Sequence, residues 1–278
     1  GTICDPDAPL LHADDLAAVR GDGIFETVLV RSGRARCIGL HLDRLTRSAA
    51  MLALPTPDRE QCGRAIDIAA REWSSKVGPD SEGMLRLVYS RGRENGDGTP
   101  TAYVTVSAVA DRVAAVRRAG VSVVTLDRGY SIDLAEHAPW QLLGAKTLSY
   151  ATNMAALRYA TEQGFDDVIY VSSEGAVLEG PRSTVIAVFG DTLVTPPDEI
   201  GILPGTTQQA VFALADNEGW TTKTEVLKRP DLIRADSVWM VSSVTLAARV
   251  TALNRYVMPV AHDLERFTDL VDRAICAD

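Results

Sequence analysis

The sequence predicts a mixed α/β (α+β) fold divided into two subdomains. The chain has 278 residues, which is the size at which single hydrophobic cores stop growing, about 250 to 300 residues. Strand-like and helix-like segments alternate along it, and its 46% hydrophobic and 23% charged residues are typical of a globular protein. A charged stretch from Asp111 to Gly120 separates the halves, so we expect an N-terminal subdomain at 1–115 and a C-terminal one at 116–278.

The first half is predicted to be rich in strands. Apolar runs with many β-branched residues predict strands at 24–30, 84–90 and 102–109. Between the first two of these, apolar residues recur at helical spacing in two segments, 42–52 and 62–73, and Pro57-Asp58 predicts the start of the second helix. A polar, glycine-rich stretch at 91–98 joins the last two strands and predicts a long hairpin loop.

In the second half, the same reasoning predicts strands and helices in alternation. The expected strands are 121–126, 167–172 and 237–242, and the expected helices are 150–160, 206–218 and 264–275. Gly164 and Gly219 follow the first two helices and are suited to end them.

Charge and cysteine usage exclude several classes of protein. The formal net charge of −9 disfavours a nucleic-acid partner, so any anionic ligand must be held by a local group of cations and helix N-termini. The four cysteines are scattered, which argues against a disulfide framework and against a zinc or other metal site. Without an apolar run of roughly 20 residues or a signal pattern, we expect a cytoplasmic protein with no membrane contact. The start at Gly1, without Met, predicts that residues of the first strand are missing upstream.

Lys146 is the first candidate for chemistry. It lies among apolar and small residues just ahead of the predicted helix at 150–160. Desolvation there would lower the pKa of its amine and make the amine a nucleophile and a carrier of protons. The alternative is an ordinary surface lysine.

Later segments supply an acid and a set of anion donors. Glu179 ends a segment predicted to be a short apolar strand, where it either pairs with a cation or forms a plain salt bridge. Thr206 and Thr207 open a helix after Pro204-Gly205, which is an arrangement that binds phosphate but that also occurs as a helix cap without ligand. Ser243 leaves the end of a strand and is a further hydroxyl donor or simply a turn residue.

Arg44 completes this set as a bidentate cation. Its alternative is an ion pair on the surface of its helix. An amine, a carboxylate for a pyridine nitrogen and several phosphate donors are the three requirements of pyridoxal 5′-phosphate. We therefore predict that cofactor.

In this order, the motifs resemble those of the class IV pyridoxal phosphate enzymes, which include branched-chain aminotransferases, D-amino-acid aminotransferases and aminodeoxychorismate lyases. The resemblance rests on Arg20-Gly-Asp-Gly-Ile-Phe-Glu-Thr27, His41-x-x-Arg44-Leu45, Lys146, Glu179, Gly205-x-Thr207 and Ser242-Ser243. It implies two α/β subdomains with the cofactor between them, in a homodimer.

The resemblance also implies roles for single residues. Lys146 would bond covalently to the cofactor and Glu179 would face its pyridine nitrogen. The phosphate would be held by Arg44, Thr206, Thr207 and Ser243. Departures from the family pattern lie at Gly180-Pro-Arg-Ser-Thr184, at Gln208 and at Leu246-Ala-Ala-Arg-Val250.

Among class IV enzymes, the segment from Gly21 to Thr27 looks like that of aminodeoxychorismate lyases. It predicts elimination of pyruvate from 4-amino-4-deoxychorismate to give 4-aminobenzoate, a step of folate biosynthesis. The first alternative is a class IV aminotransferase acting on D-amino acids or branched-chain L-amino acids. The second is a protein that binds the cofactor without turnover.

Candidate residues for binding the small-molecule substrate are Phe25, Arg182 and Arg249. The alternative for each of the two arginines is an ion pair with a nearby acid. Arg91 and Arg93, on the predicted hairpin loop, are weaker candidates of the same kind.

Overall fold

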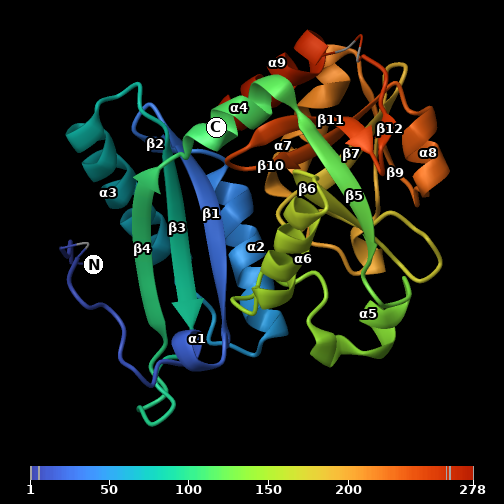
Figure 1. The fold of residues 1–278 in the computed structure, drawn as a ribbon. Coiled ribbons are helices and arrows are strands. Elements are labelled where there is room, and N and C mark those ends of the chain that lie inside the picture. The colour runs from blue at the N-terminus through green and yellow to red at the C-terminus, as the bar shows by residue number, and fades with distance from the viewer. Residues whose placement is uncertain (1, 6, 261, 263, 278) are drawn as a thin grey trace. The chain divides into compact units, whose positions relative to one another are not determined.

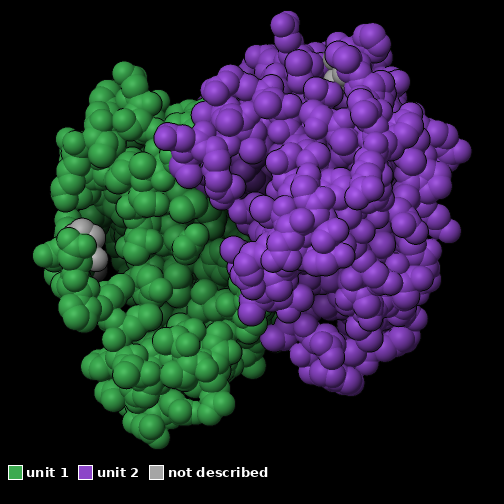
Figure 2. Space-filling model, in the orientation of Figure 1, with its two compact units in different colours: residues 1–109, 145–150 green, residues 110–144, 151–278 purple. Residues whose placement is uncertain are grey.

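A computed structural model describes residues 2–5, 7–260, 262 and 264–277 (Figure 1). The chain forms two compact units, distinguished by colour in Figure 2. Unit 1 comprises 1–109 and 145–150, and unit 2 comprises 110–144 and 151–278. Each unit has its own sheet covered by helices, so the predicted α/β fold class is confirmed. The division at residue 115 stays a prediction.

Unit 1 is built on an antiparallel sheet with the strand order β2-β1-β3-β4. The strands are β1 (Gly23–Arg31), β2 (Arg34–Ala35), β3 (Gly83–Ser90) and β4 (Thr101–Ala108). Three of them match the predicted strands to within one residue. Ser90 pairs with Thr101, so β3 and β4 form the expected hairpin around the glycine-rich loop.

Two helices lie against this sheet, as Figure 1 shows. They are α2 (Ile38–Met51) and α3 (Arg59–Val77), which follow the short α1 (Leu16–Val19). Both coincide with the predicted amphipathic segments, and they bury Leu42, Leu45 and Ile66 toward the sheet. Asp58 caps α3 by accepting a hydrogen bond from the amide of Gln61, at the position where Pro57-Asp58 predicted a helix start.

A short return segment of the chain, 145–150, pairs with the start of β1. The amide of Phe25 donates to the carbonyl oxygen of Lys146 at 3.1 Å, and the amide of Leu148 donates to that of Gly23 at 2.8 Å. A side chain at Gly23 would lie 2.7 Å from Leu148 Cδ1, so only glycine permits this approach. The pairing fixes the backbone of Lys146 against β1.

Unit 2 contains a mixed sheet with the strand order β6-β5-β11-β10-β7-β8-β9, and β12 pairs with β11. Its strands are β5 (Val121–Asp127), β6 (Asp167–Val171), β7 (Thr184–Phe189), β8 (Thr192–Thr195), β9 (Thr221–Thr224), β10 (Ser237–Ser242), β11 (Leu246–Leu253) and β12 (Tyr256–Val257). The predicted strands correspond to β5, β6 and β10. The central strands are almost wholly buried, as expected for a sheet covered on both faces.

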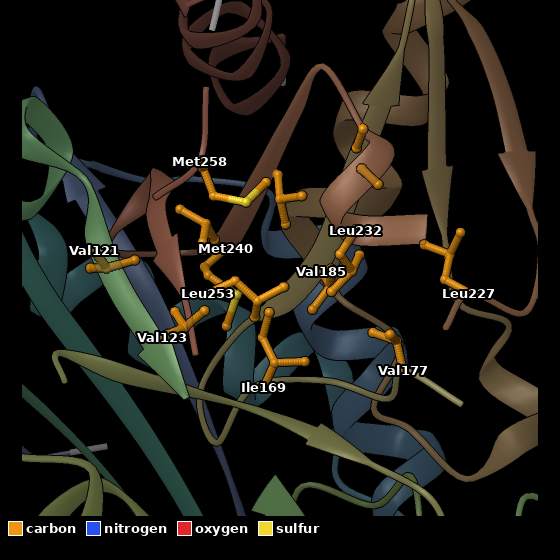
Figure 3. Close-up of a cluster of buried hydrophobic side chains, with 14 of the residues drawn as sticks. Val121, Val123, Ile169, Val177, Val185, Leu227, Leu232, Met240, Leu253 and Met258 are labelled. Carbon is orange, nitrogen blue, oxygen red and sulfur yellow. The ribbon is translucent and has the colours of Figure 1, made fainter. Parts of the chain in front are cut away.

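The helices of unit 2 are α4 (Asp111–Ala119), α5 (Leu134–His137), α6 (Ala151–Glu162), α7 (Thr206–Ala215), α8 (Arg229–Arg234) and α9 (Leu264–Cys276). α4 forms from the charged stretch that we expected to be a connection, because Val113 gives it one buried anchor. A core cluster of this unit lies between the sheet and the neighbouring segments, with Val123, Ile169, Val177 and Met240 among its members (Figure 3). None of the helices in the described part of the chain is long and apolar enough to cross a membrane.

Candidate active site

Lys146 lies against two aromatic rings of unit 1. Its ammonium nitrogen is 4.3 Å from the ring centre of Phe25 and 5.9 Å from that of Tyr150. The two rings meet edge to face, with their centres 5.5 Å apart. The backbone amide of Lys146 donates to Ser48 Oγ of α2 at 3.1 Å. Lys146 is half-buried, and its amine lies in a partly aromatic environment.

Arg44 takes part in a buried charge cluster in the same unit. Its Nε and Nη2 donate to the two carboxylate oxygens of Glu26, at 2.9 and 2.7 Å, and His41 Nδ1 lies 2.7 Å from Glu26 Oε2. All three side chains are at most 5% exposed. A bidentate pair of this kind fixes the plane of the guanidinium group. The structure thus places Arg44 on the sheet side of α2 and not on an exposed helix surface.

The cluster controls two protonation states. Burial alone would raise the pKa of Glu26, but the charge and hydrogen bonds of Arg44, together with His41, outweigh it and hold that pKa far below its ordinary value. Burial lowers the pKa of His41, and the charges of Arg44 and Lys146 lower it further against the opposing effect of Glu26. Glu26 is therefore ionised and His41 neutral at pH 7. The sequence signal for the cluster is a glutamate within the apolar run of β1.

In unit 2, Glu179 follows a segment fixed by the core. Ala176, Val177 and Leu178 are all buried, and Val177 belongs to the cluster of Figure 3. The segment makes isolated bridges and does not form the short strand that we expected. The amide of Tyr170 donates to the carbonyl of Glu179 while the amide of Leu178 donates to that of Tyr170. Two residues thus oppose one, as in a β-bulge, which redirects a side chain.

The carboxylate of Glu179 is itself held in place. Its Oε2 accepts from the backbone amide of Leu203 at 3.1 Å. This hydrogen bond restricts the position of the carboxylate group. The segment before α7 thus has two roles. The amide of Leu203 binds the carboxylate of Glu179, and Pro204 and Gly205 lead into the start of the helix.

A second group of polar residues, also in unit 2, was not foreseen from the sequence. The guanidinium group of Arg128 lies 4.3 Å from the ring centre of Tyr170, and its Nη1 donates to Asn153 Oδ1 at 2.9 Å. Asn153 Nδ2 in turn donates to the carbonyl of Pro181, two residues after Glu179. Burial raises the pKa of the Tyr170 phenol, against the charge of Arg128. These contacts hold the chain just after Glu179.

The predicted phosphate donors of unit 2 come together from two elements. Thr206 Oγ1 at the start of α7 lies 3.1 Å from Ser243 Oγ, which follows β10. Thr206 and Thr207 are 2% and 3% exposed, so their hydroxyls are shielded from bulk water. No side chain caps α7, because Gly205 is its N-cap residue. The first amides of an α-helix have no partner within the helix and bind anions.

The arginines predicted as candidate substrate-binding residues have different surroundings. Arg182 Nη2 lies 3.9 Å from Asp167 Oδ2, which is the alternative expected for it. Arg249 lies opposite Trp239 in the β10–β11 pair, so the two side chains share a face of the sheet. Arg91 and Arg93 form ion pairs with Asp22 and Asp14, both at 2.7 to 2.8 Å within unit 1. Among the described residues, no group of histidine, cysteine and acidic side chains is suited to hold a metal ion.

Comparisons with known proteins identify the family of the chain. The family described as "Amino-transferase class IV" matches residues 23–253. A "Bifunctional aminodeoxychorismate lyase / D-amino acid transaminase" from Mycobacterium tuberculosis is 52% identical over 100% of this chain and 98% of its own length. The chain therefore belongs to the class IV aminotransferase family, as the motifs predicted.

Solved structures show the same fold. A hypothetical aminotransferase from M. tuberculosis, in a form with α-ketoglutarate and PMP and in a PLP-bound form, has a TM-score of 0.97 at 52% identity, covering 100% of this chain and 97% of that one. The fold IV transaminase CpuTA1 from Curtobacterium pusillum has a TM-score of 0.93 at 42% identity, covering 100% and 93%. The expected class IV fold is thereby confirmed.

Proposed function

We propose that this chain catalyses both the elimination of pyruvate from 4-amino-4-deoxychorismate and the transamination of D-amino acids. It is an enzyme of the class IV family, and its cofactor is pyridoxal 5′-phosphate. The proposal takes both activities because the M. tuberculosis relative at 52% identity is named for both. The segment from Gly21 to Thr27 adds weight to the lyase activity.

The residues present fit the cofactor. Lys146 supplies an amine shielded by Phe25, which suits it to bond to an aldehyde. Thr206 and Ser243 bring two hydroxyls within 3.1 Å of each other at an uncapped helix start, which is a donor set for phosphate. Glu179 supplies the carboxylate for a pyridine nitrogen. When bound, the cofactor supplies an electron sink for the charge left on the substrate after a proton is removed.

Lys146 is proposed to move the proton in both reactions. Its amine takes a proton from the substrate carbon that bears the nitrogen. It then gives this proton to a different atom, which is not the same in the two reactions. In the lyase reaction, loss of the enolpyruvyl group as pyruvate leaves the aromatic ring of 4-aminobenzoate. In the transaminase reaction, Lys146 would return the proton on the cofactor side, and water would release the keto acid; the amino group would stay on the cofactor until a second keto acid takes it up.

The single observation that supports this role most strongly is the position of the Lys146 amine beside Phe25 and Tyr150. The ring faces restrict the directions in which the flexible side chain can point. The backbone pairing with β1 and the hydrogen bond to Ser48 fix the rest of the residue. An amine held in this way needs little reorganisation to exchange protons with one fixed atom.

Product analysis tests the proposal. Cofactor-loaded protein is incubated with enzymatically generated 4-amino-4-deoxychorismate, and 4-aminobenzoate and pyruvate are measured together. Parallel samples receive D-alanine or L-leucine with α-ketoglutarate. We expect equimolar 4-aminobenzoate and pyruvate, and glutamate from D-alanine.

The possible failures are distinct. Glutamate without any aromatic product would remove the lyase activity, and 4-aminobenzoate without glutamate would remove the transaminase activity. If no substrate reacted although the cofactor was bound, the protein would be a binding module without turnover.

A further inference from the structure

The turn that bears Ser243 has a strained backbone. Ser242 of β10 pairs with Leu246 of β11, so residues 243–245 form a three-residue hairpin turn. Such turns end on a residue in the left-handed conformation, for which glycine is the usual choice. Here the residue is Leu246, with φ of +63° and a buried side chain. A non-glycine residue in this conformation is strained, so other contacts must hold the turn.

Arg117 of α4 supplies those contacts. Its Nη2 donates to the carbonyl oxygen of Val244 at 2.5 Å, and its Nε donates to that of Thr245 at 3.3 Å. The fork of one guanidinium group thus holds two successive carbonyls of the turn. The amide of Thr245 donates in addition to Ser242 Oγ at 3.3 Å. α4 itself lies against β11 and is anchored by the buried Val113.

The direction of these carbonyls matters for an anion site. Both carbonyl oxygens accept hydrogen bonds from Arg117, so they are directed toward α4. A carbonyl oxygen that faced a phosphate would repel it, whereas hydroxyl and amide groups attract it. Arg117 therefore both fixes the turn and keeps two acceptor groups away from the position where Ser243 meets Thr206.

We infer that Arg117 is a positioning residue for the cofactor phosphate, acting through the 243–245 turn and not through its own charge. This inference rests on the proposed role of Ser243 and Thr206 as phosphate donors. With the turn held, Ser243 Oγ stays within 3.1 Å of Thr206 Oγ1. Without Arg117, the strain at Leu246 favours other turn conformations, in which Ser243 moves away.

The test compares pyridoxal 5′-phosphate with pyridoxal, which lacks the phosphate. Dissociation constants for both are measured by absorbance titration of the full chain carrying Arg117→Ala, Arg117→Lys or Ser243→Ala. Arg118→Ala is the matched control, because Arg118 is the exposed neighbour of Arg117 on α4. Folding of each variant is checked by its thermal unfolding midpoint, and Arg117→Lys serves if Arg117→Ala does not fold.

For Arg117→Ala we expect the dissociation constant of pyridoxal 5′-phosphate to rise about tenfold, since the two hydrogen bonds that hold the turn are lost and water replaces them only in part. The constant for pyridoxal should change by less than about twofold, because the inferred role of the turn concerns only the phosphate. Arg117→Lys should keep most of the defect, since an ammonium group cannot hold both carbonyls as a fork. Arg118→Ala should behave as the unmodified protein.

A double-mutant cycle with Ser243→Ala tests whether Arg117 acts through Ser243. If it does, Arg117→Ala adds little to the defect of Ser243→Ala. Full additivity, complete rescue by Arg117→Lys, or an equal loss of pyridoxal and pyridoxal 5′-phosphate binding would overturn the inference. If Ser243→Ala itself left phosphate-dependent binding intact, the proposed phosphate site would fail together with the role of Arg117. A defect in Ser243→Ala with none in the Arg117 variants would overturn the role of Arg117 alone.

Discussion

The ammonium nitrogen of Lys146 lies 4.3 Å from the ring centre of Phe25. At this distance, the negative face of the ring attracts the cation, by about 0.5 to 2 kcal/mol depending on exposure. Phe25 follows Ile24 on β1, and its own amide bonds to the carbonyl of Lys146. Phe25 and Lys146 are thus in contact through both their backbones and their side chains.

Replacing Phe25 by leucine removes the ring that positions the Lys146 amine for proton transfer. Turnover should fall by about 2- to 30-fold, equivalent to about 0.5 to 2 kcal/mol. Phe25→Tyr keeps the ring and should retain most of the activity. Rates with saturating D-alanine and α-ketoglutarate would check this. Equal activities of the leucine and tyrosine variants would show that the ring face has no part in the reaction.

The buried pair of Glu26 and Arg44 should be essential for stability. Glu26→Gln leaves the guanidinium of Arg44 buried without its counter-charge, so the free energy of unfolding should fall by about 3 to 5 kcal/mol. Glu60, which pairs with Arg64 on the exposed face of α3, gives the matched control, and Glu60→Gln should change little. Urea unfolding of the two variants compares them. A similar small effect for both would mean that Arg44 finds water or another partner.

Stability should also depend on pH through His41. Burial lowers the pKa of His41 below its ordinary value of 6.5, so below that pH the unfolded chain takes up a proton that the folded protein does not. The contribution of His41 is therefore fully present above pH 6.5 and is lost as pH falls toward its folded pKa. Glu26 contributes little to the change in stability in this pH range, because its pKa is 4.5 in the unfolded chain and lower in the folded protein.

The measurement is urea unfolding of the cofactor-free protein at about pH 7.5, 6 and 5. Wild-type protein should lose stability over this range, and His41→Gln should lose less. His12→Gln, at an exposed histidine, should follow the wild type. Parallel curves for wild type and His41→Gln would contradict the assignment.

Gly205 should tolerate no side chain. Its φ is −74°, so the backbone is ordinary, but an added Cβ would overlap Thr184 Oγ1 of β7. Gly205→Ala should therefore move the start of α7, weaken cofactor binding and cost about 1 to 3 kcal/mol of stability. Adding Thr184→Ala should restore part of both losses. Gly63→Ala in α3, where the nearest atom is 4.0 Å away, is the control and should be neutral or stabilising.

Most of the fold could be predicted from periodicity. The strands at 24–30 and 84–90 and the helix after Asp58 were clear, because their apolar residues recur with the period of one structure only. β7 was missed although it is almost wholly buried, since a short apolar run without alternation does not distinguish a strand from other buried segments. α4 was missed because Arg117 and its charged neighbours leave a single buried residue.

The residues of the candidate site could be predicted from the sequence, but the contacts among them could not. Lys146, Glu179 and Thr206 each follow from a local motif, whereas the hydrogen bond from Leu203 to Glu179 and the fork of Arg117 join segments far apart in sequence. The buried pairing of Arg44 with Glu26 likewise depends on how α2 lies on β1. The roles of these residues, the homodimer and the cytoplasmic location remain predictions.

Reductive labelling tests the central claim, the bond between the cofactor and Lys146, most directly. Protein loaded with pyridoxal 5′-phosphate is treated with borohydride, digested and analysed by mass spectrometry. The sequence contains only three other lysines, Lys76, Lys223 and Lys228, which serve as internal controls. We expect the phosphopyridoxyl group on Lys146 alone, and its absence in Lys146→Ala. Stoichiometric label on another lysine, with Lys146 unmodified, would contradict the account.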